Sequence, residues 1–327
     1  MKIKTHFLIV ISFLIVTTKL SFSQINVGPF EDGVIKSKKF PEGNIEELKK
    51  TKTVFIYGKN DETELENWKK IFEKVWTLTP VEFVSYENID AYSSNPNYSF
   101  ITISARKTTE TTSQSNMPDV SFNYMQFYLR LSMRGVDAKG KTFNRTFFRI
   151  ELNPNYYTMH LLELTKKENF FNTAYEKGKF YSFYPGLIMN ELKIANDHLK
   201  TGETRWMFSS QSNKDEMTKL KSDTLFIPDY VLINFDKLSG DELRKFDEVQ
   251  LMALYSGKYK FITAKELSDK ILNDTHGFYY MLYIKSSSNK FINVFNSNNG
   301  ELIYSEYKAR SYNVKEDDFK DMMDVVK

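Results

Sequence analysis

Hydrophobic and polar positions recur along the chain with two periods, and these predict a succession of strands and helices. The apolar runs at 53–57, 81–85 and 98–104 have the length and composition of buried strands. Residues 63–76 instead place apolar side chains at helical spacing, on one face of a predicted helix: Leu65, Trp68, Ile71, Phe72 and Val75. A shorter helix is predicted near 87–92. The first half of the chain therefore interleaves strands with helices.

The second half repeats this order. Residues 224–227 (TLFI) match 53–56 (TVFI), and a helix is predicted to start at Ser239, which forms a capping box with Glu242. A strand at 258–263, a helix at 264–272 and a strand at 279–284 follow. At a constant offset of 178, the apolar positions from Leu65 to Ile89 fall on those from Leu243 to Leu267. The repeat predicts two copies of one α/β unit, each with its own core; chance similarity between generic α/β segments is the alternative.

Each copy continues into a hairpin and a closing helix, which gives the order β-α-β-α-β-β-α. The hairpins are predicted at 121–134 with 141–152 and at 291–295 with 301–307, and the closing helices at 187–199 and 315–326. The predicted fold class is therefore α/β (α+β), with tandem duplicated domains that each hold a small mixed sheet with helices. The predicted segments are an N-terminal extension at 24–47, a first domain at 48–200, a polar linker at 201–221 and a second domain at 222–327.

The first 23 residues have the pattern of a secretory signal peptide. Lys2 and Lys4 precede an apolar run at 7–16, and Ser23 provides a small residue before the expected cut. The run is shorter than the roughly 20 residues that span a bilayer. We therefore expect cleavage before Gln24 and export to the periplasm or the exterior, with an uncleaved anchor as the alternative.

Charge and cysteine content narrow the function classes. Residues 1–23 hold three of the 45 basic residues and none of the 42 acidic ones, so the rest of the chain carries 42 of each. A formally neutral chain has no overall field that attracts nucleic acid or anionic lipid. The chain has no cysteine, which excludes disulfides and thiol chemistry.

The element order resembles two known folds. It is similar to the thioredoxin order, although no CxxC is present. The short strand that runs into a short helix at 259–267, with its counterpart at 83–89, resembles the anticodon-binding-like domain of bacterial envelope proteins. Examples are the N-terminal domain of the Tol-system β-propeller protein and the periplasmic domain of the curli-secretion channel. The chain is also similar to exported bacterial proteins of unassigned role with two such modules. The resemblance implies a role in envelope assembly or partner binding and supplies no catalytic residue.

Motifs of known chemistry are scarce. His160, His198 and His276 lie far apart and form no zinc motif, so no metal or cofactor is predicted. No GxSxG or phosphate-binding glycine loop occurs, and Ser209-Ser210 falls in the predicted linker. A catalytic pair assembled from distant residues stays open.

The first hairpin is the candidate partner surface. Alternation places its apolar residues on a core face: Met125, Phe127, Leu129, Leu131, Met133, Phe148, Ile150 and Leu152. The opposite face holds the predicted partner-binding residues: Tyr124, Tyr128, Arg130, Arg134, Phe143, Arg145, Phe147 and Arg149. Arginine and aromatic residues dominate binding hot spots. The alternative is that a helix or the other domain covers this face.

These observations predict a non-enzymatic binding or assembly protein of the bacterial cell envelope. Its expected partner is an envelope protein or a glycan, and not nucleic acid. A hydrolase with a site in the inter-domain cleft and a stabilising module without its own ligand are the alternatives. The partner and the oligomeric state are not determined by the sequence.

Overall fold

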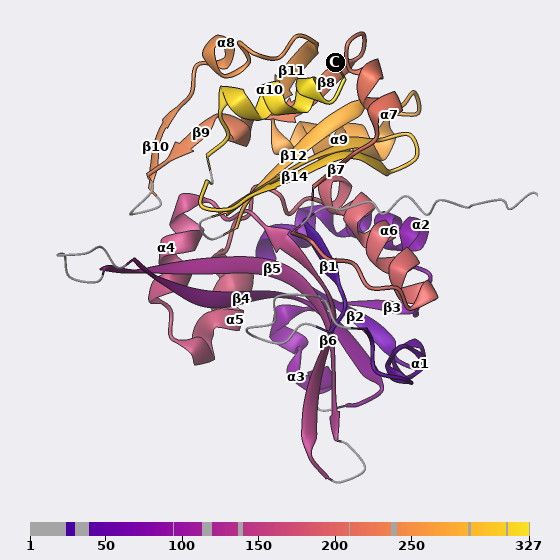
Figure 1. Ribbon diagram of the computed structural model, residues 1–327. Helices are drawn as coiled ribbons and strands as arrows, with labels where there is room; N and C mark the ends of the chain where they lie inside the picture. The colour runs from indigo at the N-terminus through magenta and orange to yellow at the C-terminus, as the bar shows by residue number, and fades with distance from the viewer. Residues whose placement is uncertain are drawn as a thin grey trace, which may run out of the picture.

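Two six-stranded mixed sheets form the framework of the protein, which confirms the predicted α/β (α+β) class. Figure 1 shows the second half of the chain stacked on the first. The computed structural model describes residues 24–29, 39–93, 95–112, 120–136, 140–208, 210–236, 241–286, 289–311 and 313–326. The predicted signal segment, Ser209, Ser239 and the side chains of 108–124 lie outside this description.

The first sheet has the strand order β1-β6-β5-β4-β2-β3. Its strands are β1 (Ile25–Val27), β2 (Lys52–Tyr57), β3 (Val81–Ser85), β4 (Tyr98–Thr112), β5 (Val120–Val136) and β6 (Thr142–Leu152). The helices of this half are α1 (Asn44–Lys49), α2 (Leu65–Val75), α3 (Asp90–Ser93), α4 (Tyr156–Leu164), α5 (Phe170–Lys177) and α6 (Pro185–Thr201), with 3-10 turns η1 (Lys59–Glu64), η2 (Tyr86–Asn88) and η3 (Lys167–Asn169).

The second sheet has the order β11-β8-β12-β13-β14-β7. Its strands are β7 (Gln211–Ser212), β8 (Thr224–Pro228), β11 (Lys258–Ile262), β12 (Tyr279–Ser286), β13 (Asn289–Asn296) and β14 (Glu301–Lys308). A separate ribbon pairs β9 (Ile233–Phe235) with β10 (Glu242–Lys245). The remaining elements are α7 (Lys214–Lys219), η4 (Asp229–Leu232), α8 (Glu248–Leu251), α9 (Ala264–Asn273) and α10 (Glu316–Asp324).

The two sheets share one topology. In each, a central strand pairs in parallel with two neighbours, β2 with β3 and β4, and β8 with β11 and β12. An antiparallel hairpin follows, and a short N-terminal strand closes the order, β1 beside β6 and β7 beside β14. The matched segments 53–56 and 224–227 lie on the equivalent strands β2 and β8. This agreement is what duplication of one unit produces.

The crossover between β8 and β11 departs from the predicted repeat. Glu242 lies in the exposed strand β10, and only α8 is helical. The observed N-cap is Asp247, whose carboxylate accepts a hydrogen bond from the Gln250 backbone N–H. Leu243 and Val249 are 59% and 75% exposed. The prediction of a helix from Ser239 is therefore wrong over the described residues, because a few apolar residues at helical spacing do not guarantee a buried face.

The segments predicted as extension and linker contribute to the sheets. Strand β1 falls within 24–47 and pairs with β6, and β7 and α7 fall within 201–221. Met217 and Leu220 in the latter segment are fully buried. Short edge strands contain few hydrophobic residues, so the polar composition of these two segments did not predict the strands.

Helix α6 contacts elements of both halves. The Gly186 backbone N–H donates to Ser268 Oγ of α9 at 2.9 Å, and Asn190 Nδ2 donates to the hydroxyl of Tyr280 in β12 at 2.7 Å. Toward the first half, Asn196 Oδ1 accepts from the Thr77 backbone N–H at 2.9 Å. Helix α6 therefore packs against both halves of the protein and is not the closing element of the first unit alone.

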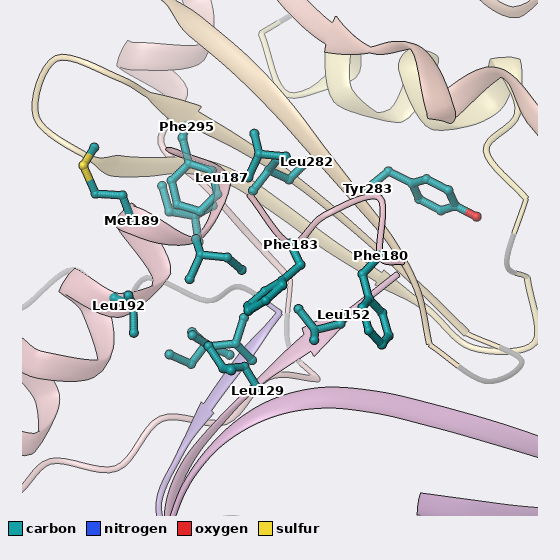
Figure 2. Packing of buried hydrophobic residues seen from close by; sticks show 14 of the residues in the cluster. Leu129, Leu152, Phe180, Phe183, Leu187, Met189, Leu192, Leu282, Tyr283 and Phe295 are labelled. Atoms are coloured by element: carbon teal, nitrogen blue, oxygen red, sulfur yellow. The ribbon is translucent and has the colours of Figure 1, made fainter. Parts of the chain in front are cut away.

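The buried hydrophobic residues form one cluster that continues across both halves. Figure 2 shows Phe183 between Leu129 and Leu152 of the first sheet and a group above it that holds Leu187 of α6 with Leu282 and Phe295 of the second sheet. The prediction of a separate core in each unit is therefore wrong. Within the described chain, no helix has the length and hydrophobicity to cross a membrane.

Candidate partner-binding site

A β-bulge divides the predicted binding face into two parts. Leu131 pairs with Phe148, but the next residue, Ser132, pairs with Thr146, so Phe147 is an extra residue in β6. A bulge of one residue moves the side chains beyond it to the opposite face of the sheet. The eight predicted residues therefore do not share one face.

The part of the hairpin near the second half is buried. Arg149 is 2% exposed, and its Nε lies 2.5 Å from Oε1 of Glu151. The guanidinium carbon lies 4.9 Å from the ring centroid of Tyr128, which is also buried. Ser286 of β12 donates to the other carboxylate oxygen of Glu151 at 2.5 Å. The second sheet therefore covers this part, and Tyr128 and Arg149 are inaccessible to a partner.

Phe147 is also buried. Its ring stacks on Phe40 with 6.0 Å between centroids, and the side chain is 1% exposed. Arg130 lies opposite Arg149 on the neighbouring strand and is half-buried. Three of the predicted partner-binding residues, Tyr128, Phe147 and Arg149, are therefore buried in this structure, because alternation reports a face but not what covers it. The side chain of Tyr124 lies outside the description.

The far end of the hairpin, by contrast, lines a pocket of about 360 Å³. Figure 1 shows this end of β5 and β6 directed away from the second half. Arg134, Phe143 and Arg145, all predicted binding residues, lie in the pocket wall, and Glu47 and Lys50 from the α1 region complete the charged part of it. Three of the eight predicted residues therefore lie at this end of the hairpin, with Phe143 and Arg145 on one face and Arg134 on the other.

Close contacts on both sides of the Phe143 ring hold this aromatic wall of the pocket in place. The ring of Phe143 lies so close to Gly135 that a Cβ there would be 2.5 Å from Cζ of the ring. The Arg145 guanidinium carbon lies 4.0 Å from the centroid of the same ring. Arg145 also forms an ion pair with Glu47. Cation–π and carboxylate contacts together hold the arginine in place.

The pocket has an excess of positive charge. Lys50 and Arg145 lie in its wall, against the single carboxylate of Glu47. Lys50 forms no ion pair with any residue that the structure describes. Guanidinium groups bind carboxylates through paired hydrogen bonds. The pocket therefore suits an anionic group.

Part of the outer edge of β6, next to Phe143 and Arg145 of the pocket wall, has no partner strand among the described residues. Strand β1 pairs with β6 only from Phe148 to Ile150, and the Gly28 backbone N–H donates to the Phe147 carbonyl oxygen. No strand among the described residues pairs with the outer edge of β6 from Thr142 to Thr146. Such an edge offers backbone donors and acceptors to an extended peptide.

Sequence reasoning missed Glu47 and Lys50. Both lie near the end of α1, in a segment predicted as extension or domain boundary. A charged pair on a short surface helix has no distinguishing pattern. Only the fold places it beside the hairpin.

A second polar cluster joins α4 to the β9–β10 ribbon. His160 Nε2 lies 3.1 Å from Asp241 Oδ1, and the Tyr181 hydroxyl donates to Glu242 Oε1 at 2.8 Å. The Tyr156 backbone N–H donates to the same carboxylate oxygen at 2.9 Å. Within the described part of the chain, His160 forms no hydrogen bond to a serine or threonine hydroxyl. The cluster therefore gives the hydrolase hypothesis no activated nucleophile.

Lys285 is a buried cation beside this cluster. It is 6% exposed, and its Nζ lies 3.6 Å from the ring centroid of Phe235 and 3.8 Å from Met159 Sδ. Burial lowers the pKa of Lys285 to about 7, against the opposing effect of Glu242 and Asp241. Its location indicates a structural role between the halves.

The other histidines lie elsewhere. His198 is in α6, where burial lowers its pKa, and His276 is exposed after α9. The described residues hold no group of three or more His, Cys, Asp or Glu side chains that could bind a metal ion.

Comparison of the chain with models of protein families, with curated proteins and with solved structures finds no match in any of the three. The functional argument therefore depends on the site itself.

Proposed function

We propose that the protein is an exported, non-enzymatic binding protein that holds an extended acidic segment of a partner protein at the far end of its first hairpin. The observation that carries this proposal is the basic, aromatic-walled pocket beside an edge of β6 that no strand of the described chain pairs with. Of the two partner classes expected from the sequence, this pairing favours a protein over a glycan, because a strand edge recognises peptide backbone.

Two kinds of contact would act together in such a complex. The outer edge of β6 at Thr142–Thr146 would add the partner as a further strand, through backbone hydrogen bonds. Alternate side chains of that strand would face the pocket, where Lys50 and Arg145 would receive carboxylates. The acidic side chains give specificity, and the backbone contacts give affinity.

Export to the cell envelope is part of the same proposal. It is supported by the signal pattern at 1–23 and by the resemblance of the element order to envelope domains. The cysteine-free chain forms no disulfide in either a reducing or an oxidising compartment.

The test is direct peptide binding. A labelled peptide of alternating Glu and Val is titrated with the protein, and fluorescence anisotropy gives Kd; a Gln–Val peptide is the reference. We expect Arg145→Gln and Lys50→Gln each to weaken binding about tenfold, since a hydrogen bond to a charged group contributes about 1.5–3 kcal/mol. Loss of the surface ion pair with Glu47 should change stability by less than about 1 kcal/mol.

Two further variants act as controls. Arg244→Gln removes an exposed arginine on β10, in the other half of the molecule, and should leave Kd unchanged. Gly135→Ala should displace the Phe143 ring and weaken binding without altering charge. Equal binding of the two peptides, or equal Kd for Arg145→Gln and Arg244→Gln, contradicts the proposed site.

A further inference from the structure

The first residue after the expected cut is buried between the two sheets. Gln24 is fully buried, and so are the next three residues, which form β1. Its carbonyl oxygen accepts from the Glu151 backbone N–H at 3.2 Å. Its side-chain Oε1 accepts from Nδ2 of Asn293, in β13 of the second sheet, at 2.8 Å. Gln24 therefore bridges the halves rather than forming a loose end.

A free N-terminus at this place would be unfavourable. Cleavage before Gln24 creates an α-amino group, whose ordinary pKa of about 7.7–8.0 leaves it mostly charged at neutral pH. A buried charge needs a partner. The charge of the adjacent carboxylate of Glu151 is already compensated by the buried Arg149, and its other oxygen accepts from Ser286.

Only one of the two polar atoms in the Gln24 side chain has a hydrogen-bond partner among the described residues. Oε1 has a partner in Asn293, whereas the buried Nε2 has no hydrogen-bond partner among the described residues. An unpaired buried amide N–H is destabilising. Two problems thus meet in one residue: an amine that would be charged and an amide nitrogen without an acceptor.

We propose that Gln24 is a modification site, at which the mature N-terminus cyclises to pyroglutamate. The α-amino nitrogen attacks the side-chain amide carbon Cδ, the bond from Cδ to Nε2 breaks, and a proton passes from the attacking amine to the departing nitrogen. Ammonia leaves, and a neutral five-membered lactam remains. No oxidant, reductant or further reactant is required.

The product suits its surroundings. The reaction removes the positive charge and the nitrogen that lacks a partner. The side-chain oxygen, which accepts from Asn293 in the uncyclised residue, becomes the lactam carbonyl and is still a hydrogen-bond acceptor. The modified residue would therefore have no charge and no amide NH₂ group to leave unpaired. This inference goes beyond the binding function, and it rests on the proposed export.

The experiment is mass spectrometry of the protein secreted with its own leader from a bacterial host. We expect the intact mass to be lower by one ammonia than that of a chain starting at Gln24, and the N-terminal peptide to resist amine labelling. A free amine on Gln24 overturns the proposal. An N-terminus at another residue overturns both it and the predicted cut. Loss of peptide binding with a cyclised Gln24 would instead count against the binding function alone.

A stability measurement tests whether cyclisation of Gln24 stabilises the fold or occurs without a structural effect. Gln24→Ala keeps a free amine after cleavage, so its melting temperature should lie below that of the cyclised protein at pH 7. The difference should narrow between pH 7 and 9, because the folded state binds the amine's proton less well than the unfolded state. Equal melting temperatures at pH 7 would overturn the structural role. A variant that does not fold still leaves the mass measurement decisive.

Discussion

Asp318 is the anchor of a buried charge network, and its replacement gives the sharpest stability prediction. Its Oδ2 lies 2.5 Å from Nζ of Lys290, whose side chain is 1% exposed. The same carboxylate accepts from Lys308 Nζ at 2.8 Å and, as a helix cap for α10, from the Lys315 backbone N–H at 2.7 Å. Burial lowers the pKa of Lys290, and Asp318 opposes this effect.

Asp318→Asn removes the charge that compensates Lys290. Removing one partner of a buried pair costs about 3–5 kcal/mol, because the remaining charge is left without compensation. Asp321→Asn is a matched control, since Asp321 also binds Lys308, at 2.6 Å, but is 46% exposed. Its loss should be less than about 1 kcal/mol. The loss of stability in Lys290→Met should fall between those of the two aspartate variants, because Asp318 then keeps its ion pair with Lys308 and its capping hydrogen bond from Lys315.

Urea unfolding followed by circular dichroism measures the three free energies of unfolding. The loss in Asp318→Asn should shrink as the pH rises, because the stranded Lys290 can then lose its proton. If Asp318→Asn and Asp321→Asn are equally stable, the network does not hold the buried lysine, and the reasoning is refuted.

Two further predictions concern the contact between the halves. Because the folded pKa of Lys285 is about 7 and the unfolded value is about 10.4, the folded chain has fewer protons over this range, and stability should rise with pH between them. Urea titrations at pH 7, 8 and 9 should show this rise in the wild type and lose it in Lys285→Met; parallel pH profiles would contradict it. Gly186→Ala places a Cβ about 2.3 Å from the Ser268 carbonyl oxygen and should lower stability by roughly 1–3 kcal/mol in a melting experiment. Lys200→Gly, at an exposed position of the same helix, is the control for helix propensity alone and should cost at most about 1 kcal/mol.

The spacing of hydrophobic residues correctly predicted the elements in which that spacing is most regular. Helix α2 buries Trp68, Ile71, Phe72 and Val75, as the spacing predicted, and the long hairpin formed where alternation placed it. Such segments bury one face against a sheet, so their hydrophobic residues must recur with the period of the element.

The errors arose where the relation between segments decides the outcome. The bulge at Phe147 is set by strand register, and the burial of Tyr128 and Arg149 by a second sheet that the first-half sequence does not encode. Short strands such as β1 and β7 depend on neighbours for their existence. The pocket combines α1 with a hairpin about 90 residues away, and no spacing rule predicts that meeting.

The contacts of the N-terminal strand have a consequence for the order of folding. Ile25 pairs with Ile150, and the side chain of Gln24 reaches Asn293, which is 269 residues away. Contacts between such distant segments close large loops and slow the search for the native state. Strand β1 is synthesised first, but it can complete its contacts only after nearly the whole chain has been made. Until β1 docks, the inner part of the β6 edge is exposed to incorrect pairing partners.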